Sequence, residues 1–563
     1  MYSNKKNVLQ LVALLKAFEI KQIVLSPGSR NSPVTHSFAV DSFFTCHTVV
    51  DERSAGFYAI GIIMHTGKPV AVCCTSGTAV LNLGPSVAEA YYQQLPLLII
   101  TADRPGAWIG QMAGQTFPQP GVFNTLVKKS VQLPEINTSE DEWYCNRLIN
   151  EALLELNYPI AAPVHINIPV SEPLFEYTIG QLPQVRKIDR CISTPEMDEK
   201  LEMDGYGERF QQYKKRMIVV GQLLWQWQTE DIRELLEEMA EEHDCIILAE
   251  HLSNIRSPYI ISNFDVFLYA LPKEEQDTYG PELLITFGGH IVSKRIKQFL
   301  QKNKPKEHWH ISPTGEIIDL YKCLTHVIEA DALSVLDYLV SCDNPDENGD
   351  KPYALSWGNA IKKLPPARIM EFSDLLVVKE LIETIPRDSA LHLANSSSVR
   401  LAQLFPLRSD VMIYCNRGTS GIDGCLSTTV GYASVSEKLT FLLIGDLAFF
   451  YDMNGLWNRQ INKNIRILLN NNGGGEIFYT LPGLNKSEAL ETYISASHQT
   501  QAKAWAEATG FTYLSISNES ELKKTMYVFT DNKSDKPILL EVFSSMRKNA
   551  EILRYFYHEL KKK

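Results

Sequence analysis

Short apolar runs rich in β-branched residues alternate with helical patterns along almost the whole chain. A run of this kind, bounded by glycine, proline or serine, is typical of a strand in a parallel sheet, and the helical stretch after it is the crossover to the next strand. The chain is therefore predicted to be an α/β protein of mostly parallel sheets flanked by helices. Its 563 residues, 45% hydrophobic and 21% charged, exclude a small stapled scaffold, a collagen-like chain and wholesale disorder.

The alternation is interrupted twice, which divides the chain into three α/β domains. Charge rises and apolar content falls across 184–208, and 343–350 is an acidic stretch rich in turn residues. We predict domains at residues 1–183, 184–346 and 347–563, of which the first and third resemble each other in pattern. The expected strands are Gln22–Leu25, Phe44–Val50, Val70–Cys74, Leu97–Thr101, Val164–Ile168, Met217–Val220, Ile246–Ala249, Leu283–Thr286, Trp309–Ile311, Met412–Cys415, Leu439–Ile444, Ile465–Leu469 and Ile538–Val542.

The balance of charge argues against partners that need a basic surface. The chain has 54 Lys and Arg against 66 Asp and Glu, a net charge of −12 with a pI near 5.6, so no global field attracts nucleic acid or an anionic membrane. The ten cysteines contain no C-x-x-C pair, and no apolar run approaches the length of about 18 residues that spans a membrane. We expect a cytoplasmic protein with reduced thiols, no membrane insertion and no nucleic-acid partner.

Two polar loops in the third domain each follow an apolar strand. Gly445-Asp446-Leu447 comes directly after 439–444, and three asparagines followed by three glycines, 470–475, come directly after 465–469. In an α/β sheet such loops leave the carboxyl ends of the strands, where ligands bind. A carboxylate and an amide oxygen can share one hard cation, and glycine lets a phosphate approach the backbone. The two loops therefore predict a site for Mg²⁺ bridging a diphosphate.

These loops resemble the cofactor motif of the thiamine-diphosphate decarboxylase superfamily, which begins Gly-Asp-Gly and ends Asn-Asn. Leu447 stands where the superfamily's Gly-Asp-Gly has its second glycine. The resemblance implies thiamine diphosphate with Mg²⁺ or Mn²⁺, the metal being held by Asp446, the second asparagine of the pair and a carbonyl two residues later. An ungapped alignment selects Asn472 and the carbonyl of Gly474. Because three asparagines stand in a row, the pair one residue earlier, Asn471 and the carbonyl of Gly473, stays open as the alternative.

The first domain resembles the superfamily's pyrimidine-binding domain in three segments, Thr75–Ala79, Thr101–Pro105 and Ala162–Pro169. The resemblance implies that Glu52, which precedes a helix-like stretch, is the carboxylic acid that activates the aminopyrimidine of the cofactor. Ile422 would be the apolar wedge under the bent cofactor. The other expected cofactor contacts are Thr78, Ser396, Gly445 and Leu447.

Within this superfamily the chain is similar to the 2-succinyl-5-enolpyruvyl-6-hydroxy-3-cyclohexene-1-carboxylate (SEPHCHC) synthase family, the MenD family of menaquinone biosynthesis. The similarity extends in the family's order over nearly the whole chain, through Ser26–Pro33, Asn395–Arg400 and Asn416–Gly424. It implies a transferase that decarboxylates 2-oxoglutarate and adds the resulting four-carbon unit to isochorismate, with release of CO₂. The expected catalytic residues are Glu52, Ser396 and Arg400.

Several arginines in loops around the diphosphate site indicate polyanionic substrates, because arginine binds carboxylates through paired, charge-assisted hydrogen bonds. The family's two substrates carry two carboxylates each, which is the kind of group that these arginines bind. The middle domain contributes only Ser293-Lys294-Arg295 to the expected site and is otherwise predicted to be mainly structural. The expected substrate-binding residues are Ser29, Arg30, Arg104, Gln115, Lys294, Arg295, Arg400 and Arg417, with Ile477 and Phe478 as an apolar wall.

In the superfamily the pyrimidine-binding domain of one subunit meets the diphosphate-binding domain of another. We therefore expect a homodimer with active sites at the interface, and a dimer of dimers stays open. Two other functions also stay open: a different thiamine-diphosphate enzyme, such as an acetolactate synthase or a 2-oxoacid decarboxylase, and a non-catalytic member that binds a partner or metabolite. His308 and His310 lie on one side of a strand and could ligate a metal, but no third ligand is in view.

Overall fold

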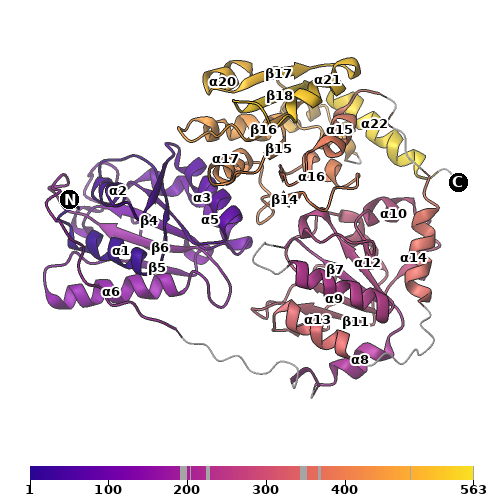
Figure 1. Ribbon diagram of the computed structural model, residues 1–563, viewed down its shortest axis with the longest axis horizontal. Helices are drawn as coiled ribbons and strands as arrows, with labels where there is room; N and C mark the ends of the chain where they lie inside the picture. The colour runs from indigo at the N-terminus through magenta and orange to yellow at the C-terminus, as the bar shows by residue number, and fades with distance from the viewer. Residues whose placement is uncertain are drawn as a thin grey trace.

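The computed structural model describes residues 1–190, 200–202, 204–223, 229–342, 351–365, 369, 371–481 and 483–561. Over these residues the chain forms three six-stranded sheets, and every pairing between their strands is parallel. Helices flank each sheet (Figure 1). The predicted α/β architecture of three sheets is confirmed.

The first sheet lies at the left in Figure 1. Its strands, in spatial order, are β2 (Thr45–Thr48), β1 (Gln22–Leu25), β3 (Val70–Cys74), β4 (Leu97–Asp103), β6 (Val164–Pro169) and β5 (Lys129–Gln132). One face packs on α1 (Lys6–Ala17), α2 (Ser32–Ala39) and α6 (Ser139–Leu154). The other face packs on α3 (Glu52–Thr66), α4 (Thr78–Asn82) and α5 (Gly84–Tyr92).

The third sheet, at the top in Figure 1, repeats this strand order. Its strands are β14 (Met412–Tyr414), β13 (Ala390–Leu393), β15 (Thr440–Gly445), β16 (Ile465–Asn471), β18 (Ile538–Phe543) and β17 (Thr512–Ile516). The helices on its faces and edges are α15 (Asp374–Thr384), α16 (Ser397–Ala402), α17 (Cys425–Val435), α18 (Asp446–Tyr451), α19 (Ile477–Thr480), α20 (Lys503–Ala508), α21 (Glu519–Phe529) and α22 (Met546–Glu559). The predicted resemblance between the first and third domains is confirmed in their topology.

The middle sheet has a different strand order, which is that of dinucleotide-binding folds. Its strands are β9 (Ile260–Ile261), β8 (Cys245–Ala249), β7 (Arg216–Val220), β10 (Leu283–Phe287), β11 (Glu307–Ile311) and β12 (His326–Ile328). One face packs on α8 (Tyr206–Gln212), α9 (Thr229–Glu242) and α13 (Ala332–Ser341). The other face packs on α10 (Phe264–Ala270), α11 (Gln276–Tyr279), α12 (Lys294–Lys302) and α14 (Pro352–Lys362).

The junction between the middle and third domains lies near helix α14. The predicted second linker, 343–350, lies outside the described residues, as do 191–199 and 203 of the first. Helix α14 follows the second linker in the chain, yet its Trp357 is fully buried in the core of the middle domain. The carboxylate of Asp244, next to β8, accepts hydrogen bonds from the backbone N–H groups of Tyr353 and Ala354. The boundary at residue 346 stays a prediction, and α14 packs with the domain that precedes it.

Helices α3 and α17 cross in close contact and join the cores of the first and third domains. A Cβ atom at Gly61 would lie 1.9 Å from the carbonyl oxygen of Thr428, and one at Gly431 would lie 2.0 Å from that of Tyr58. A larger residue at either position would therefore push the two backbones apart. The two glycines allow the close crossing that holds the first and third sheets together within the chain.

Asp452 is a fully buried carboxylate beside this crossing. It accepts hydrogen bonds of 2.7 Å from the backbone N–H and from Oγ of Ser427, and burial raises its pKa from 3.8 to about 6. As pH rises from about 4 to about 6, the unfolded state releases this proton before the folded state does. The free energy of unfolding therefore falls with rising pH over this window.

We predict that Asp452→Asn removes this pH dependence. Relative to the variant, the unaltered protein should lose about 3 kcal/mol of unfolding free energy between pH 4 and pH 7. Denaturant unfolding of both proteins across this range measures the difference, with Asp535→Asn, a change at an exposed carboxylate, as the control. A difference between the two proteins that is constant with pH would contradict the prediction.

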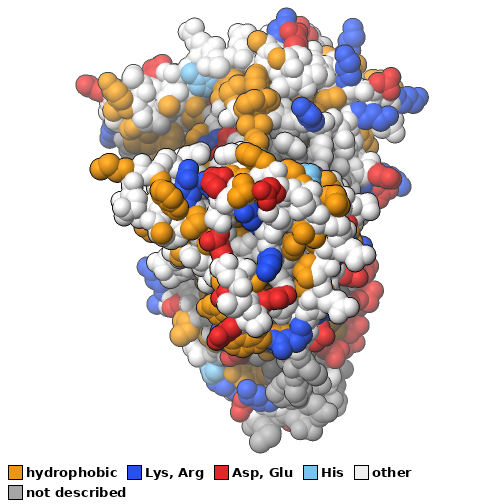
Figure 2. Space-filling view, turned by 90° about the vertical axis from the view of Figure 1, so that its left-hand side faces the viewer, with side chains coloured by type: hydrophobic (Ala, Val, Ile, Leu, Met, Phe, Trp, Pro, Cys, Tyr) orange, Lys and Arg blue, Asp and Glu red, His pale blue; other side chains and the backbone are white. Residues whose placement is uncertain are grey.

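The side of the molecule that carries the first domain shows basic and acidic side chains interspersed among apolar groups (Figure 2). No continuous basic surface is visible on that side. Among the described residues, no helix combines the length and apolar character needed to cross a lipid bilayer.

Candidate active site

The carboxyl ends of β15 and β16 lie side by side, as the sequence predicts. Gly445 ends β15 and pairs with Asn470 of β16, while Asp446 begins α18. The two polar loops meet at this edge of the sheet around a cavity of about 140 Å³. Nine of the predicted site residues line it: Ser396, Ile422, Gly445, Asp446, Leu447, Asn472, Gly474, Ile477 and Phe478.

The Asp446 carboxylate joins the two loops. It accepts hydrogen bonds from the backbone N–H groups of Leu447 (2.7 Å), Gly473 (2.8 Å) and Gly474 (2.9 Å). Nε2 of His498 lies 3.3 Å from its Oδ2. Burial raises the pKa of Asp446, and His498 together with the three N–H groups opposes that shift. The asparagine–glycine loop is therefore held in place by the residue that is expected to carry the metal.

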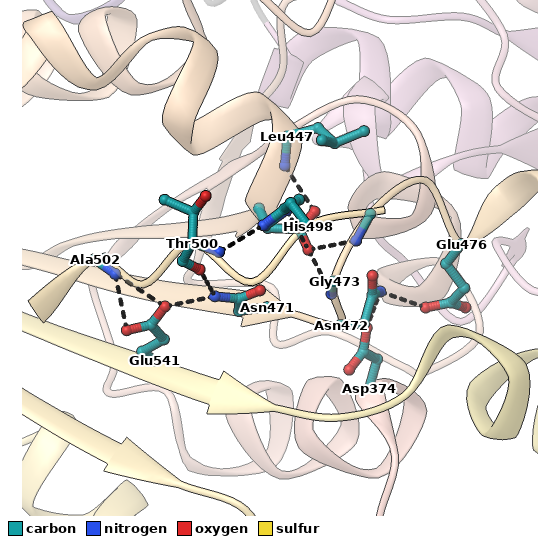
Figure 3. A network of polar contacts seen from close by, with 12 residues as sticks. Asp374, Leu447, Asn471, Asn472, Gly473, Glu476, His498, Thr500, Ala502 and Glu541 are labelled. Carbon is teal, nitrogen blue, oxygen red and sulfur yellow. Dashed lines mark hydrogen bonds and ion pairs between the residues drawn. The ribbon is translucent and has the colours of Figure 1, made fainter. Parts of the chain in front are cut away.

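The three asparagines point to opposite sides of the end of β16. Asn470 and Asn472 line the cavity, and the carbonyl oxygen of each side chain is buried without a hydrogen-bond partner among the described residues. Asn471 does not line it, because its amide donates instead to the carbonyl of Thr500 (2.8 Å) and to Glu541 (2.7 Å). Figure 3 shows this separation, with Asn471 directed toward Glu541 and Asn472 toward Asp374.

A pair of buried carboxyl groups holds the amide of Asn472. Its Nδ2 donates to Oδ2 of Asp374 (2.9 Å) and to Oε2 of Glu476 (2.8 Å), as Figure 3 shows. Burial and the neighbouring Asp374 raise the pKa of Glu476 well above its ordinary value. Since both carboxyl groups bind the nitrogen end of the amide, the buried oxygen end of Asn472 is left without a hydrogen-bond partner among the described residues.

Ser396 is strained and lies at the beginning of α16. Its φ of 71° and ψ of −124° are in a region that residues other than glycine rarely adopt, which is typical of functional sites. The neighbouring Asn395 donates to the carbonyls of Asn416 (2.6 Å) and Gly421 (2.7 Å) and accepts from Arg417 (2.8 Å). Asn395 therefore fixes both the arginine and the loop that leads to Ile422.

A second cavity of about 400 Å³ lies between the middle and third domains. Four predicted substrate residues line it: Lys294, Arg295, Arg400 and Ile477. Ile477 lines both cavities, so that the basic residues of α12 and α16 lie next to the cavity of the cofactor motif.

The chain matches two family models. Residues 8–124 match "Thiamine pyrophosphate enzyme, N-terminal TPP binding domain", and residues 194–393 match "Middle domain of thiamine pyrophosphate". The chain is 53% identical to the 2-succinyl-5-enolpyruvyl-6-hydroxy-3-cyclohexene-1-carboxylate synthase of Bacteroides thetaiotaomicron and 52% identical to that of Bacteroides fragilis, in both cases over all of each chain. The synthase of the same name from Flavobacterium johnsoniae is 37% identical over 98% of each chain.

The chain belongs to the SEPHCHC synthase family. It is thus a member of the thiamine-diphosphate superfamily, and the resemblance found in its motifs is confirmed.

Six residues that the SEPHCHC synthase resemblance assigns lie in the first domain and line neither cavity. They follow the carboxyl ends of β1, β2, β3 and β4 and therefore share one edge of the first sheet: Ser29, Arg30, Glu52, Thr78, Arg104 and Gln115. Glu52 begins α3, half-buried, with Nδ2 of Asn82 at 3.5 Å from its Oε2. Arg30 is buried and donates to the carbonyl of Val170 and to Glu172, each at 2.9 Å. A single chain does not bring this group to the cavity of Asp446.

Several side chains at the candidate active site were not predicted from the sequence. Asp374, Glu476 and His498 surround the metal-ligand candidates. Asp374 and His498 each stand alone in an ordinary stretch of sequence, whereas Glu476 lies directly between the asparagine–glycine loop and Ile477, where its position in the chain was a signal. The structure also explains the two histidines of β11: Oγ1 of Thr286 lies 2.9 Å from a ring nitrogen of His308 and of His310. No group of three metal-binding His, Cys, Asp or Glu side chains occurs in the described part of the chain.

Proposed function

We propose that this chain makes SEPHCHC, the product in its relatives' name, from 2-oxoglutarate and isochorismate with release of CO₂. The observation that carries the proposal is the junction of the two cavities at Ile477, which places cationic side chains next to the cofactor motif. Burial and the nearby Arg417 lower the pKa of Arg400. A substrate carboxylate at Arg400, which lines the second cavity, would offset the repulsion from Arg417 and favour binding.

The cavity at Asp446 fits the diphosphate of the cofactor and a divalent cation, Mg²⁺ or Mn²⁺. Asp446 offers a carboxylate, and Asn472 offers a buried carbonyl oxygen without a protein partner. Oxygen ligands of these kinds are those that Mg²⁺ prefers. The carbonyl of Gly474 would complete the protein ligands, and the exposed side chain of Ile422 would support the cofactor. When bound, thiamine diphosphate supplies the electron sink for loss of CO₂ from a 2-oxoacid.

The residues of the third domain would bind and shield the first substrate. Arg400 and Arg417 would bind the carboxylates of 2-oxoglutarate, and Ser396 would lie near its reacting carbon. Ile477 and Phe478 form an apolar wall of the cavity, which would exclude water while CO₂ leaves.

The basic residues at the start of α12 would bind isochorismate. Lys294 and Arg295 line the second cavity and not the cavity of Asp446, which the start of α16 does line. The first-domain residues of another subunit would complete this binding site: Ser29, Arg30, Arg104 and Gln115.

The division of the site favours a homodimer in which two subunits share each active site. Glu52 is needed at the cofactor to hold and exchange a proton at the ring nitrogen of the aminopyrimidine, yet it lines neither cavity of its own chain. Glu52 reaches the cofactor if Glu52 of one subunit faces Asp446 of the other. Sedimentation of the active enzyme tests the assembly, including a further dimer of dimers, and an active monomer would overturn it.

The direction of the asparagine side chains leads to a prediction about the metal. We expect Asn472→Ala to raise the Mg²⁺ concentration needed for half-maximal thiamine-diphosphate binding by about 10- to 100-fold, because a cation ligand is lost. Asn471→Ala should change it by only a few-fold, since that amide faces Thr500 and Glu541. Titration calorimetry on the two folded variants makes the comparison, and the reverse ranking would move the ligands to Asn471 and Gly473.

The function is tested by following CO₂ release from 2-oxoglutarate with and without isochorismate. We expect CO₂ release to depend on isochorismate and mass spectrometry to show SEPHCHC. Turnover of pyruvate alone would instead support an acetolactate synthase or a 2-oxoacid decarboxylase. Cofactor binding without turnover of any of these substrates would support a non-catalytic member. The reduced thiols expected of a cytoplasmic enzyme call for the assay to be run under reducing conditions.

A further inference from the structure

Arg295 lies where its own helix disfavours a positive charge. Lys294 and Arg295 are the first two residues of α12, which has no acidic residue in its first turn. The amino terminus of a helix carries a partial positive charge, so two cations there repel it. The sequence therefore places the arginine at a cost in stability, and groups outside α12 must hold it.

Asp265 of α10 is the group that compensates this charge. Its Oδ2 accepts a hydrogen bond from Nη1 of Arg295, and its Oδ1 accepts one from Oγ of Ser293, the residue that caps α12. The loop before α12 is itself tied down, because buried Glu250 accepts 2.6 Å hydrogen bonds from the N–H groups of Val292 and Ser293. Asp265 therefore binds both the cap of the helix and its arginine.

Two tyrosines enclose the same guanidinium. Its central carbon lies 4.4 Å from the ring centroid of Tyr557 and 4.9 Å from that of Tyr269, which are cation–π distances. Nη1 also lies 3.3 Å from the hydroxyl of Tyr557, and the two rings are 4.6 Å apart. Tyr557 belongs to α22, so the last helix of the chain reaches the cavity between the middle and third domains.

These contacts leave part of the guanidinium available to a ligand. Both hydrogen bonds to Asp265 and Tyr557 use Nη1, and no hydrogen bond from the described residues reaches Nε or Nη2. Asp265, Tyr269, Arg295 and Tyr557 all line the second cavity. Nε and Nη2 together form the edge with which arginine binds a carboxylate through two hydrogen bonds.

We propose that Asp265 and Tyr557 are positioning residues that hold Arg295 with its Nε and Nη2 edge toward the second cavity for a carboxylate of isochorismate. The inference rests on the proposed function and deepens it. A held arginine loses little side-chain freedom when the substrate binds, whereas a free one loses more rotamer entropy. The C-terminal helix is thereby part of substrate recognition.

The test separates the two substrates. We expect Asp265→Asn to raise the KM for isochorismate by about 10- to 100-fold, the loss expected for a hydrogen bond to a charged group. The KM for 2-oxoglutarate, kcat and thiamine-diphosphate affinity should stay within about two-fold. Tyr557→Leu should have a similar effect, and Tyr557→Phe, which keeps the ring, a smaller one. The matched controls are Asp277→Asn and Tyr527→Phe, two exposed positions away from both cavities.

A double-mutant cycle decides whether Asp265 acts through Arg295. In an Arg295→Ala background, Asp265→Asn should change the isochorismate KM by less than about two-fold, because the group it positions is gone. An equal loss in both backgrounds, or an equal rise in both KM values, would overturn the proposal and leave the proposed function intact. If the unaltered enzyme released no CO₂ in response to isochorismate, the proposed function and this inference would both fall.

Discussion

An enzyme with Glu52→Gln is expected to lose about 10²- to 10⁴-fold in turnover while it still folds and binds thiamine diphosphate. Glutamine can form a hydrogen bond to the aminopyrimidine but cannot hold and return a proton. The side chain is half-buried at the first turn of α3, and its contact with Asn82 is a long 3.5 Å, so the substitution disturbs little of the fold. The loss should therefore appear in kcat.

Isochorismate-dependent CO₂ release measures the activity, and calorimetry measures cofactor affinity in the same preparation. Glu140→Gln, an exposed change of the same kind on α6, is the matched control and should leave both unchanged. Turnover of the Glu52 variant within about two-fold of the unaltered enzyme would remove Glu52 from the mechanism.

Asp446→Ala is expected to weaken thiamine-diphosphate binding by about 100-fold or more and to abolish its dependence on Mg²⁺. The carboxylate is expected to be the anionic ligand of the cation. It also accepts the hydrogen bonds of Gly473 and Gly474, so its removal frees the loop that would supply the other ligands. Both effects weaken cofactor binding, which precedes the chemical step.

Asp446→Asn separates the two roles of this side chain. Asparagine can still accept a hydrogen bond from the glycine loop but lacks the negative charge, so loop order should survive while Mg²⁺ affinity falls. Calorimetric titration with Mg²⁺ and thiamine diphosphate gives the affinities, and Asp535→Asn is an exposed control. Near-normal cofactor affinity in Asp446→Ala would exclude Asp446 as a metal ligand.

The two inactive variants together show how the site is divided. Mixed dimers of the Glu52→Gln and Asp446→Ala chains contain one active site with both defects and one with neither. We therefore expect activity to return after subunit exchange. If both residues came from the same chain, every site in the mixture would keep a defect and activity would stay lost.

Much of the fold could be predicted because its signals are local. Short apolar runs such as Val70–Cys74 and Ile465–Leu469, rich in β-branched or aliphatic residues and bounded by turn residues, predict buried strands, and the structure places strands there. The adjacency of Asp446 to the asparagine run follows from the same reasoning, because parallel strands end at one edge of a sheet. The family and its cofactor were predictable from short motifs in a fixed order.

The orientation of side chains was harder to predict from the sequence. Three consecutive asparagines are alike in sequence, and only the tertiary structure decides that Asn472, just after β16, lines the cavity while Asn471, the last residue of β16, donates to Glu541. The sequence likewise contains no hint that Glu476 and Asp374, far apart in the chain, bind the same amide.

The sequence by itself determined most of the strands, the order of the domains and the chemical types present at the site, because these depend on residues close together in the chain. The tertiary structure decided which of them meet. Arg295 contacts Asp265, 30 residues away, and Tyr557, 262 residues away, and the first-domain residues stay apart from the cavity of Asp446. Such contacts depend on how the three sheets and their helices pack against one another, and packing is set by the shapes of whole surfaces, which no local pattern records.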